Sequence, residues 1–382
     1  MYARTPFISQ VNETGQTGAK VEIFISNTST FPATPNYTLE KSNPSLTNNV
    51  VRFNVTPFIR EFIKNTYQNI RTLPNPPTLT PNAHSAYVQI KRYKNVSSIY
   101  TLLDTRTFRS FDGYRSFTDS TVFPTLPWSN EVNTFTGAFP LWNYPTGMTF
   151  YYRGSSAAST PSGLDSPGYM TVYLAPNSYV KYISIANPAN EITTNLDAVN
   201  QRYVDIPVIY QSASFPNTNY FFKGNIVEFY SASDVLLQSF TFKPLVECRY
   251  TPIPIDFINK AGGWQRVFFF KASTDKMNFT SEDYNFLTEV PTATPNSWTV
   301  SDGQTRQMNR NARRKITLNS GSVEENFKFI VEQLLLSERV IVNGLPAKIL
   351  TGDIDLIKTV NRKDLNYTLE FEYAYDEVST IY

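Results

Sequence analysis

The alternation of apolar and polar residues along this chain predicts strands over most of its length. Residues 20–25 and 225–230 follow the two-residue period of a half-buried strand, between turns rich in Gly, Pro, Asn and Ser. We expect further strands at residues 37–41, 50–55, 87–93, 98–103, 169–174, 179–185, 205–210 and 235–242. The pattern is that of a mainly β protein.

The helical period appears at two places. Thr56 can cap a short helix with Pro57 at its first position, and the apolar residues at 58, 59, 62 and 63 would line one face. Ser322 and Glu325 form a capping-box pattern, which predicts a second helix that ends near Ser337. Its apolar stripe comprises Val323, Phe327, Ile330, Val331, Leu334 and Leu335. Residues 281–287 suggest one further helical turn.

The second helix belongs to a unit with the order β-α-β-β-β-β. A strand at residues 315–318 precedes it, and Asn343-Gly344 predicts a hairpin turn after it. A second hairpin, from residues 354–359 and 367–373, is expected around a charged tip. Because one helix covers only one face of a sheet, the other face needs a partner in this chain or in another copy.

The length of 382 residues suits three domains. We expect an N-terminal β-sandwich-like domain at 1–106, a middle aromatic-rich β domain at 107–247, and a C-terminal α+β oligomerisation domain at 248–382. Prolines near residue 252 stiffen the link between the last two. The polar stretch at 289–314 predicts a long loop or an arm that crosses the surface.

Charge and targeting signals narrow the function classes. The net charge of +2 provides no global field for nucleic acid or an anionic membrane, so we expect neither as a partner. The basic run at 306–314 is a local exception that fits either phosphate contacts or a solvated, ion-paired strip. No apolar run reaches 18 residues, so membrane insertion is not expected. Cys248 is the sole cysteine, which excludes an internal disulfide and fits assembly in a reducing cytoplasm.

The sequence contains no catalytic signature. His84 is the only histidine, which removes most catalytic relays and transition-metal sites. Nucleotide-binding glycine loops and hydrolase motifs are absent from the sequence. We therefore expect no enzyme activity, cofactor or metal.

The aromatic-rich segment between residues 128 and 152 allows two interpretations. Its rings could stack on the apolar faces of sugars, or they could form a small core under long loops. In the first case the candidate glycan contacts are Trp128, Trp142, Tyr144 and Tyr151.

Several motifs carry a resemblance to a known family. They are Val11–Gln16, Lys20–Ile25, Thr56–Phe62, Phe111–Tyr114, Tyr250–Pro252, Phe257–Trp264, Val323–Phe327, Gln333–Glu338 and Asn366–Phe371. Together they resemble virion proteins of tailed phages that infect Bacteroidetes, including flavobacterial and crAss-like phages. The β-α-β-β-β-β unit also looks like the tube-forming unit of phage tail and baseplate proteins, a fold-level analogy. We thus expect two β-sandwich-like domains, from the strand pattern, followed by an α+β unit that the analogy describes as tail-tube-like.

We therefore expect a structural protein of a phage tail, made in the host bacterial cytoplasm. It would form a baseplate ring or hub with other virion proteins, as a homo-oligomer assembled through its C-terminal domain. The candidate inter-subunit contacts are Asn361, Arg362, Lys363 and Asp364, at the charged hairpin tip. The alternative is an adhesin that binds host-surface carbohydrate, and a depolymerase is a third hypothesis.

Overall fold

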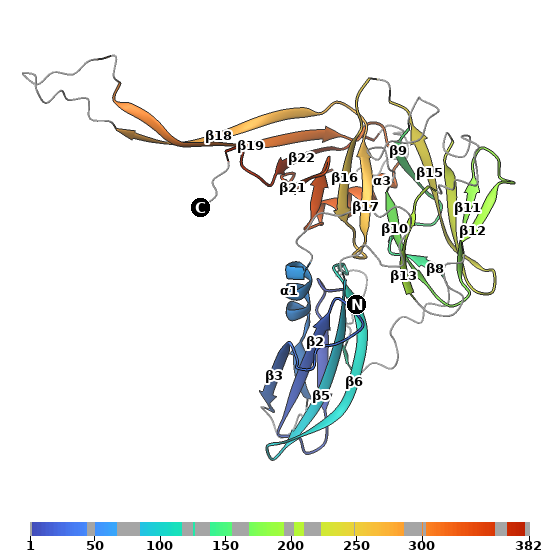
Figure 1. The fold of residues 1–382 in the computed structure, drawn as a ribbon, viewed down its shortest axis with the longest axis vertical. Coiled ribbons are helices and arrows are strands. Elements are labelled where there is room, and N and C mark those ends of the chain that lie inside the picture. Colours follow the sequence, from blue (N-terminus) through green and yellow to red (C-terminus); the bar gives the residue numbers. More distant parts are fainter. Residues whose placement is uncertain are drawn as a thin grey trace, which may run out of the picture.

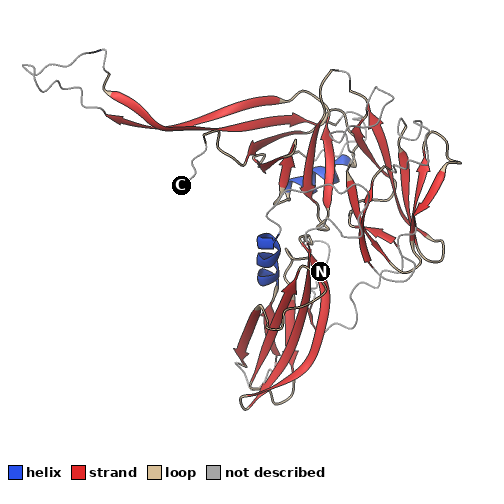
Figure 2. Cartoon of the chain, in the orientation of Figure 1, coloured by secondary structure: helices blue, strands red, loops and turns tan. Residues whose placement is uncertain are grey.

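The structure is a computed structural model that describes residues 2–43, 50–66, 85–116, 125–126, 138–154, 168–194, 202–209, 223–247, 249–285, 300, 303–355 and 365–378. Strands dominate these described residues, which also contain two helices (Figure 1 and Figure 2). The prediction of a mainly β, multidomain fold is confirmed.

The N-terminal region packs two sheets around a core of its own. The strands are β1 (Ile8–Asn12), β2 (Gly18–Ser26), β3 (Tyr37–Ser42), β4 (Val50–Asn54), β5 (Ser85–Val96), β6 (Ile99–Phe111) and β7 (Thr125–Leu126). One sheet has the order β3-β2-β5-β6 and the other β4-β1-β7. Alternate side chains from both sheets, such as Val21 and Phe53, are buried in one cluster.

Helix α1 (Thr56–Thr66) covers this core as its apolar stripe predicts. Ile59 and Ile63 are fully buried, and Phe58 and Phe62 pack partly buried against the same cluster. The Thr56 hydroxyl donates to the carbonyl of Thr5 at 3.0 Å, which ties the start of the helix to the N-terminal segment.

The middle region forms a second pair of sheets. Its strands are β8 (Ala138–Pro140), β9 (Met148–Arg153), β10 (Tyr169–Leu174), β11 (Tyr179–Ser184), β12 (Glu191–Thr194), β13 (Arg202–Pro207), β14 (Asn225–Tyr230) and β15 (Leu236–Leu245). The sheet orders are β13-β10-β8 and β12-β11-β14-β15-β9. All five strands predicted between residues 169 and 242 are present, with bounds shifted by a few residues. Strand β9 was not predicted, and it pairs in parallel with the distant β15.

The C-terminal region is built on one seven-stranded sheet. Its strands are β16 (Ile253–Ile258), β17 (Trp264–Phe269), β18 (Thr274–Asn285), β19 (Thr305–Asn319), β20 (Val340–Val342), β21 (Leu345–Ile349) and β22 (Thr368–Tyr373). The order is β17-β16-β20-β21-β22-β19-β18. Asn343 and Gly344 join β20 to β21 with φ of 49° and 83°, which confirms the predicted hairpin turn.

Helix α3 (Phe327–Leu335) is shorter than predicted. Ser322 and Glu325 precede it, and Asn326 occupies the N-cap position, so the predicted start of the helix at Ser322 is wrong. The nearby Val323 instead forms an isolated bridge with Leu365. The stripe is confirmed where the helix exists, because Ile330, Val331 and Leu334 are buried.

Two further expectations need correction. Residues 281–285 form the end of strand β18 and not a helical turn, because they pair with β19. Most of β19 lies in the stretch predicted as a loop or arm, and the two strands form a long hairpin that extends away from the body (Figure 1). Ile354 and Asp355 lie outside any strand, and the rest of the predicted second hairpin up to residue 364 lies outside the described residues.

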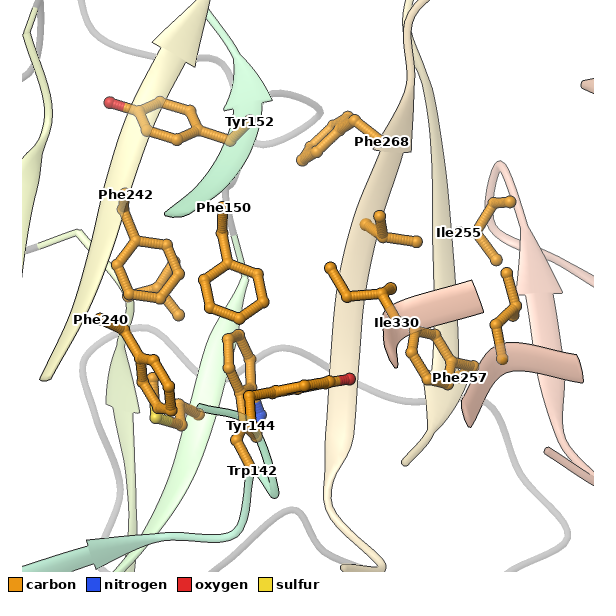
Figure 3. Close-up of a cluster of buried hydrophobic side chains, with 14 of the residues drawn as sticks. Trp142, Tyr144, Phe150, Tyr152, Phe240, Phe242, Ile255, Phe257, Phe268 and Ile330 are labelled. Carbon is orange, nitrogen blue, oxygen red and sulfur yellow. The ribbon is translucent and has the colours of Figure 1, made fainter. Parts of the chain in front are cut away.

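One hydrophobic core joins the middle region to the C-terminal sheet. It contains Trp142, Phe150 and Phe240 from the middle region together with Phe257 and Leu334 from the C-terminal region. Figure 3 shows the aromatic rings of β9 and β15 on one side of this core and the side chains of β16, β17 and α3 on the other. The N-terminal cluster is separate from it.

Candidate interaction sites

The first candidate site is the junction, where residues 2–5 and 111–116 of the N-terminal region meet the β16–β17 turn at 259–263. The Tyr114 amide donates to the carbonyl of Lys260 at 2.8 Å. A Cβ atom on Gly113 would lie 2.5 Å from the same oxygen, and one on Gly262 would lie 2.8 Å from the amide nitrogen of Gly113. Gly262 also has a φ of 86°. Only glycine permits this approach of two backbones.

Two amide side chains hold the turn in place. Asn259 Oδ1 accepts the amides of Ala261 and Gly263, each at 3.1 Å, while its Nδ2 donates to Leu141 of the middle region. From α3, Gln333 Oε1 accepts the Lys260 amide at 2.9 Å. Gln333 Nε2 reaches the carbonyl of Asn143 at 3.2 Å. The turn therefore touches all three regions.

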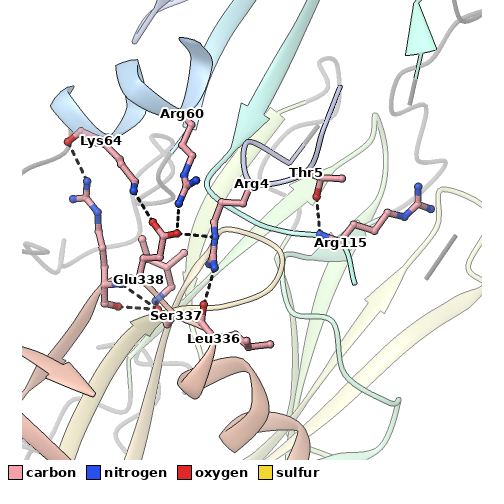
Figure 4. Close-up of polar contacts among 10 residues, drawn as sticks. Arg4, Thr5, Arg60, Lys64, Arg115, Leu336, Ser337 and Glu338 are labelled. Carbon is pink, nitrogen blue, oxygen red and sulfur yellow. Dashed lines mark hydrogen bonds and ion pairs between the residues drawn. The ribbon is translucent and has the colours of Figure 1, made fainter. Parts of the chain in front are cut away.

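A cluster of charges surrounds Glu338, just after α3 (Figure 4). Its carboxylate pairs with Arg60, with Lys64 at 2.8 Å and with Arg4 at 3.4 Å, all from the N-terminal region. Burial alone would raise the pKa of Glu338, but the Lys64 hydrogen bond and the Arg4 and Arg60 charges outweigh it and lower the pKa. The cluster holds the N-terminal region against the C-terminal region.

Asp112 lies next to this cluster and is only 2% exposed. Burial raises the pKa of its carboxyl to about 6, even though the charges of Arg4 and Arg339 act in the opposite direction. Its Oδ1 atom accepts no hydrogen bond within the described residues. The junction thus contains a carboxyl group whose ionisation weakens the contact between the N-terminal and C-terminal regions.

The junction brings together motifs that the sequence analysis quoted separately. Phe111–Tyr114, Phe257–Trp264 and Gln333–Glu338 come from different parts of the chain and meet there. Sequence reasoning did not recognise these residues as an interface. The signal available in the sequence was the glycine in each of the two turns. A glycine there can indicate that another segment of backbone packs too closely for a side chain.

The second candidate site is the arm, defined as all of β18 together with residues 305–312 of β19. Every residue of β18 is exposed, and its outer edge pairs with no described strand. The β18 length of 12 residues corresponds to about 40 Å at roughly 3.3 Å per residue. A long exposed edge of this kind is a template for another chain.

The predicted glycan contacts do not form a surface site. Trp142 and Tyr144 are 4% and 6% exposed, and both belong to the core shared by the middle and C-terminal regions. The ring centres of Trp142 and Phe150 lie 5.0 Å apart. The Tyr144 hydroxyl donates a hydrogen bond to Gln265 Oε1 at 2.6 Å. Neither ring therefore presents a free face for a sugar. Tyr151 is half-buried and donates to Glu324 at 3.1 Å.

Two other sequence expectations concern residues outside the description. Trp128 and the four predicted inter-subunit residues, Asn361, Arg362, Lys363 and Asp364, lie outside the described residues. Within the part of the chain that is described, no group of three or more His, Cys, Asp or Glu residues is arranged to hold a metal ion. No helix in that part is long and apolar enough to span a membrane.

No protein-family model matches this chain, and no curated protein or solved structure matches it.

Proposed function

We propose that this protein is a structural component of a bacteriophage virion, in a ring or hub of the tail or baseplate. It would be made in the cytoplasm of the host bacterium and assemble with copies of itself and with other virion proteins through its C-terminal domain. The sequence motifs that resemble phage virion proteins support this proposal, and three of them build the junction.

The observation that carries the proposal is the arm. A chain that works alone gains nothing from a twelve-residue strand with every side chain in solvent, because such an edge promotes association with other chains. In an assembly the same strand can reach a neighbouring subunit without disturbing the body. The arm is part of the C-terminal sheet, which is the region expected to oligomerise.

The test is the protein content of purified phage particles. We expect peptides from this chain at several copies per particle when virions are digested and quantified by mass spectrometry against the major capsid protein. Peptides from a host cytoplasmic enzyme serve as the control for contamination. A chain that is abundant in infected cells but depleted from particles to the level of that control would contradict the proposal.

An adhesin has less support than a structural role. Its argument depended on exposed rings in the aromatic-rich segment, and Trp142 and Tyr144 are buried. A depolymerase would be detected by the release of reducing ends from host capsule, and we do not expect such release.

A further inference from the structure

The arm offers a face with apolar side chains to a partner. Strand pairing places Met277 and Phe279 on the face of the ribbon that carries Ala312 and Ile316 of β19. Ile316 is buried in the core, whereas Phe279 is 59% exposed and Met277 is 41% exposed. Apolar side chains of this face therefore continue beyond the core and into solvent, with Asp275 and Arg314 among them.

The arm has no net charge, because Lys276, Arg306 and Arg310 balance Asp275, Glu282 and Asp283. Arg310 is the cation that lies beside the apolar side chains. The Arg310 guanidinium lies 5.4 Å from the ring centre of Phe279 and donates to Gln307 at 3.4 Å. It pairs with no carboxylate of the described residues. An apolar ring and a cation without an ion-pair partner thus lie together on the arm.

A complementary surface lies on the outer face of the five-stranded sheet. This acidic patch comprises Tyr179, Glu228, Tyr230, Asp234, Val235 and Leu236. The rings of Tyr179 and Tyr230 stack with centres 4.9 Å apart and an angle of 12° between their planes. Their hydroxyls donate to Asp234 at 2.9 Å and to Glu228 at 2.7 Å. Val235 and Leu236 are exposed at the turn beside them.

Carboxylates outnumber cations at the patch, because Lys181, which lies opposite Glu228, already pairs with Glu191 at 2.6 Å. Neither Glu228 nor Asp234 forms an ion pair with a described residue. The hydrogen bond to Glu228, with burial and nearby negative charge, raises the pKa of Tyr230 to about 12. Burial and the bond to Asp234 raise the pKa of Tyr179 in the same direction. Two carboxylates, those of Asp234 and Glu228, therefore contact the tyrosines of the patch, and one guanidinium, that of Arg310, lies beside Phe279 of the arm.

The two surfaces lie at opposite ends of the molecule. In Figure 1 the arm formed by β18 and β19 points to one side, while β11 and β12 lie on the far side of the body. An arm therefore cannot reach the patch of its own chain. Different, complementary surfaces at opposite ends produce heterologous contacts, which close into rings or continue as filaments.

We propose that the arm of one copy binds the acidic patch of the next copy, so that copies join head to tail. The inference rests on the proposed function, because a ring subunit needs two different contact surfaces. Phe279 and Met277 would pack on Val235, Leu236 and the tyrosine rings, with Arg310 next to Asp234 and Glu228.

The experiment uses two variants of the full chain. The arm variant carries Phe279→Asp and Arg310→Glu, and the patch variant carries Asp234→Arg and Leu236→Asp. We expect the wild-type chain to form higher oligomers in native mass spectrometry and light scattering, and each variant to lose them, with association weakened at least about tenfold. An equimolar mixture should give a heterodimer that grows no further, because it retains one intact arm and one intact patch.

The control is Lys276→Glu with Asn278→Asp, on the opposite face of the arm. Both the control and the arm variant lower the net charge by three. In the control, Lys276→Glu contributes two units and Asn278→Asp one. In the arm variant, Arg310→Glu contributes two units and Phe279→Asp one. We expect this control to keep the wild-type oligomer. Circular dichroism melts establish that all variants are folded.

Several outcomes would overturn the docking. A wild-type chain that stays monomeric at its solubility limit would do so, as would a patch variant that still assembles or a mixture that yields no heterodimer. The two proposals fail separately. A monomeric chain found in virions would leave the structural role standing without this contact, and an oligomer absent from virions would do the reverse.

Discussion

At the junction, a Cβ atom on Gly113 would lie 2.5 Å from a carbonyl oxygen, whereas in the arm all twelve side chains of β18 are exposed. Both sites use strands of the same seven-stranded sheet. At one end of that sheet the chain satisfies its contacts internally, by close packing and ion pairs. At the other end it leaves backbone edges and apolar side chains uncovered. The contrast separates residues that stabilise the subunit from residues that are available to bind a neighbour.

The largest expected effect lies in the core next to the junction. Leu334 of α3 is fully buried, and Leu334→Ala removes methyl groups and leaves a partial cavity. We expect the free energy of unfolding to fall by about 2–5 kcal/mol in denaturant melts of the full chain. Glu332→Ala, at an exposed position of the same helix, should cost less than about 0.5 kcal/mol. Equal losses at the two positions would mean that α3 does not pack on this core.

Gly262→Ala tests the close approach of backbones at the junction. The new Cβ atom would lie within 3.0 Å of Asp112 and Gly113 backbone atoms, in a residue with positive φ. Because steric overlap adds to backbone strain, we expect the free energy of unfolding to fall by about 2–4 kcal/mol. We also expect faster proteolysis near residue 115.

Gly147→Ala is the matched control for that substitution. Gly147 has a φ of 77°, but a Cβ atom there would meet nothing within 4 Å. Gly147→Ala should therefore lower the free energy of unfolding by the cost of backbone strain alone, about 1–2 kcal/mol. If both substitutions cost the same, the junction has more room than the structure indicates.

Asp112 should make the junction sensitive to pH. Its pKa of about 6 in the folded protein lies above the ordinary pKa of an aspartate carboxyl, so the folded state binds the proton more tightly than the unfolded state. The contribution of Asp112 to the free energy of unfolding is then present below pH 4 and is lost as the pH rises through about 6. The loss amounts to about 2–3 kcal/mol. Asp112→Asn should remove this part of the pH dependence and stabilise the protein at neutral pH. Thermal melts from pH 4 to pH 8 measure both.

Arg4, Arg339, Lys64 and Glu338 are the charged groups that face Asp112. Glu338 titrates with the opposite sign, because its lowered pKa stabilises the fold above the unfolded value and the effect is lost as the pH falls. Melts of Glu338→Gln over the same range separate the two contributions. A variant without Asp112 that keeps the wild-type loss between pH 4 and pH 6 would show that another group is responsible.

The smallest effect on the monomer is expected in the arm. Phe279 is exposed, so Phe279→Thr removes little buried surface and keeps a strand-forming residue. We expect the free energy of unfolding, measured at dilutions where the chain is monomeric, to change by less than about 0.5 kcal/mol. A loss comparable to that of Leu334→Ala would mean that the arm packs on its own subunit, and the contrast with the junction would disappear.

Local patterns were sufficient for elements that are determined by their own residues. Asn343 and Gly344 adopt the positive φ of a hairpin turn whatever surrounds them, because their small or short polar side chains tolerate it. The stripe of Ile330, Val331 and Leu334 likewise marks the buried face of α3, since helical spacing alone puts these residues together.

The strands of the arm lacked such a local signal. Residues 281–285 and 305–310 are mostly polar and all exposed, and their alternation is weak because no described segment covers either face. Their strand structure comes from the pairing of β18 with β19, a contact between residues far apart in sequence. The start of α3 also involves a distant segment, since Val323, which lies inside the predicted first turn, forms an isolated bridge with Leu365.

Burial of the aromatic-rich segment was also decided by tertiary structure. The spacing of Trp142, Tyr144 and Phe150 fits a sugar-binding surface as well as a core, because both are made of rings. Only the packing of β9 beside β15, and of both against β17, encloses these rings. The sequence by itself determined the strands with a regular alternation, such as β2 and β14, and the apolar face of each helix. The tertiary structure decided which aromatic residues lie inside, which glycines touch, and which strand is left without a neighbour, because each depends on contacts between segments that no local period encodes.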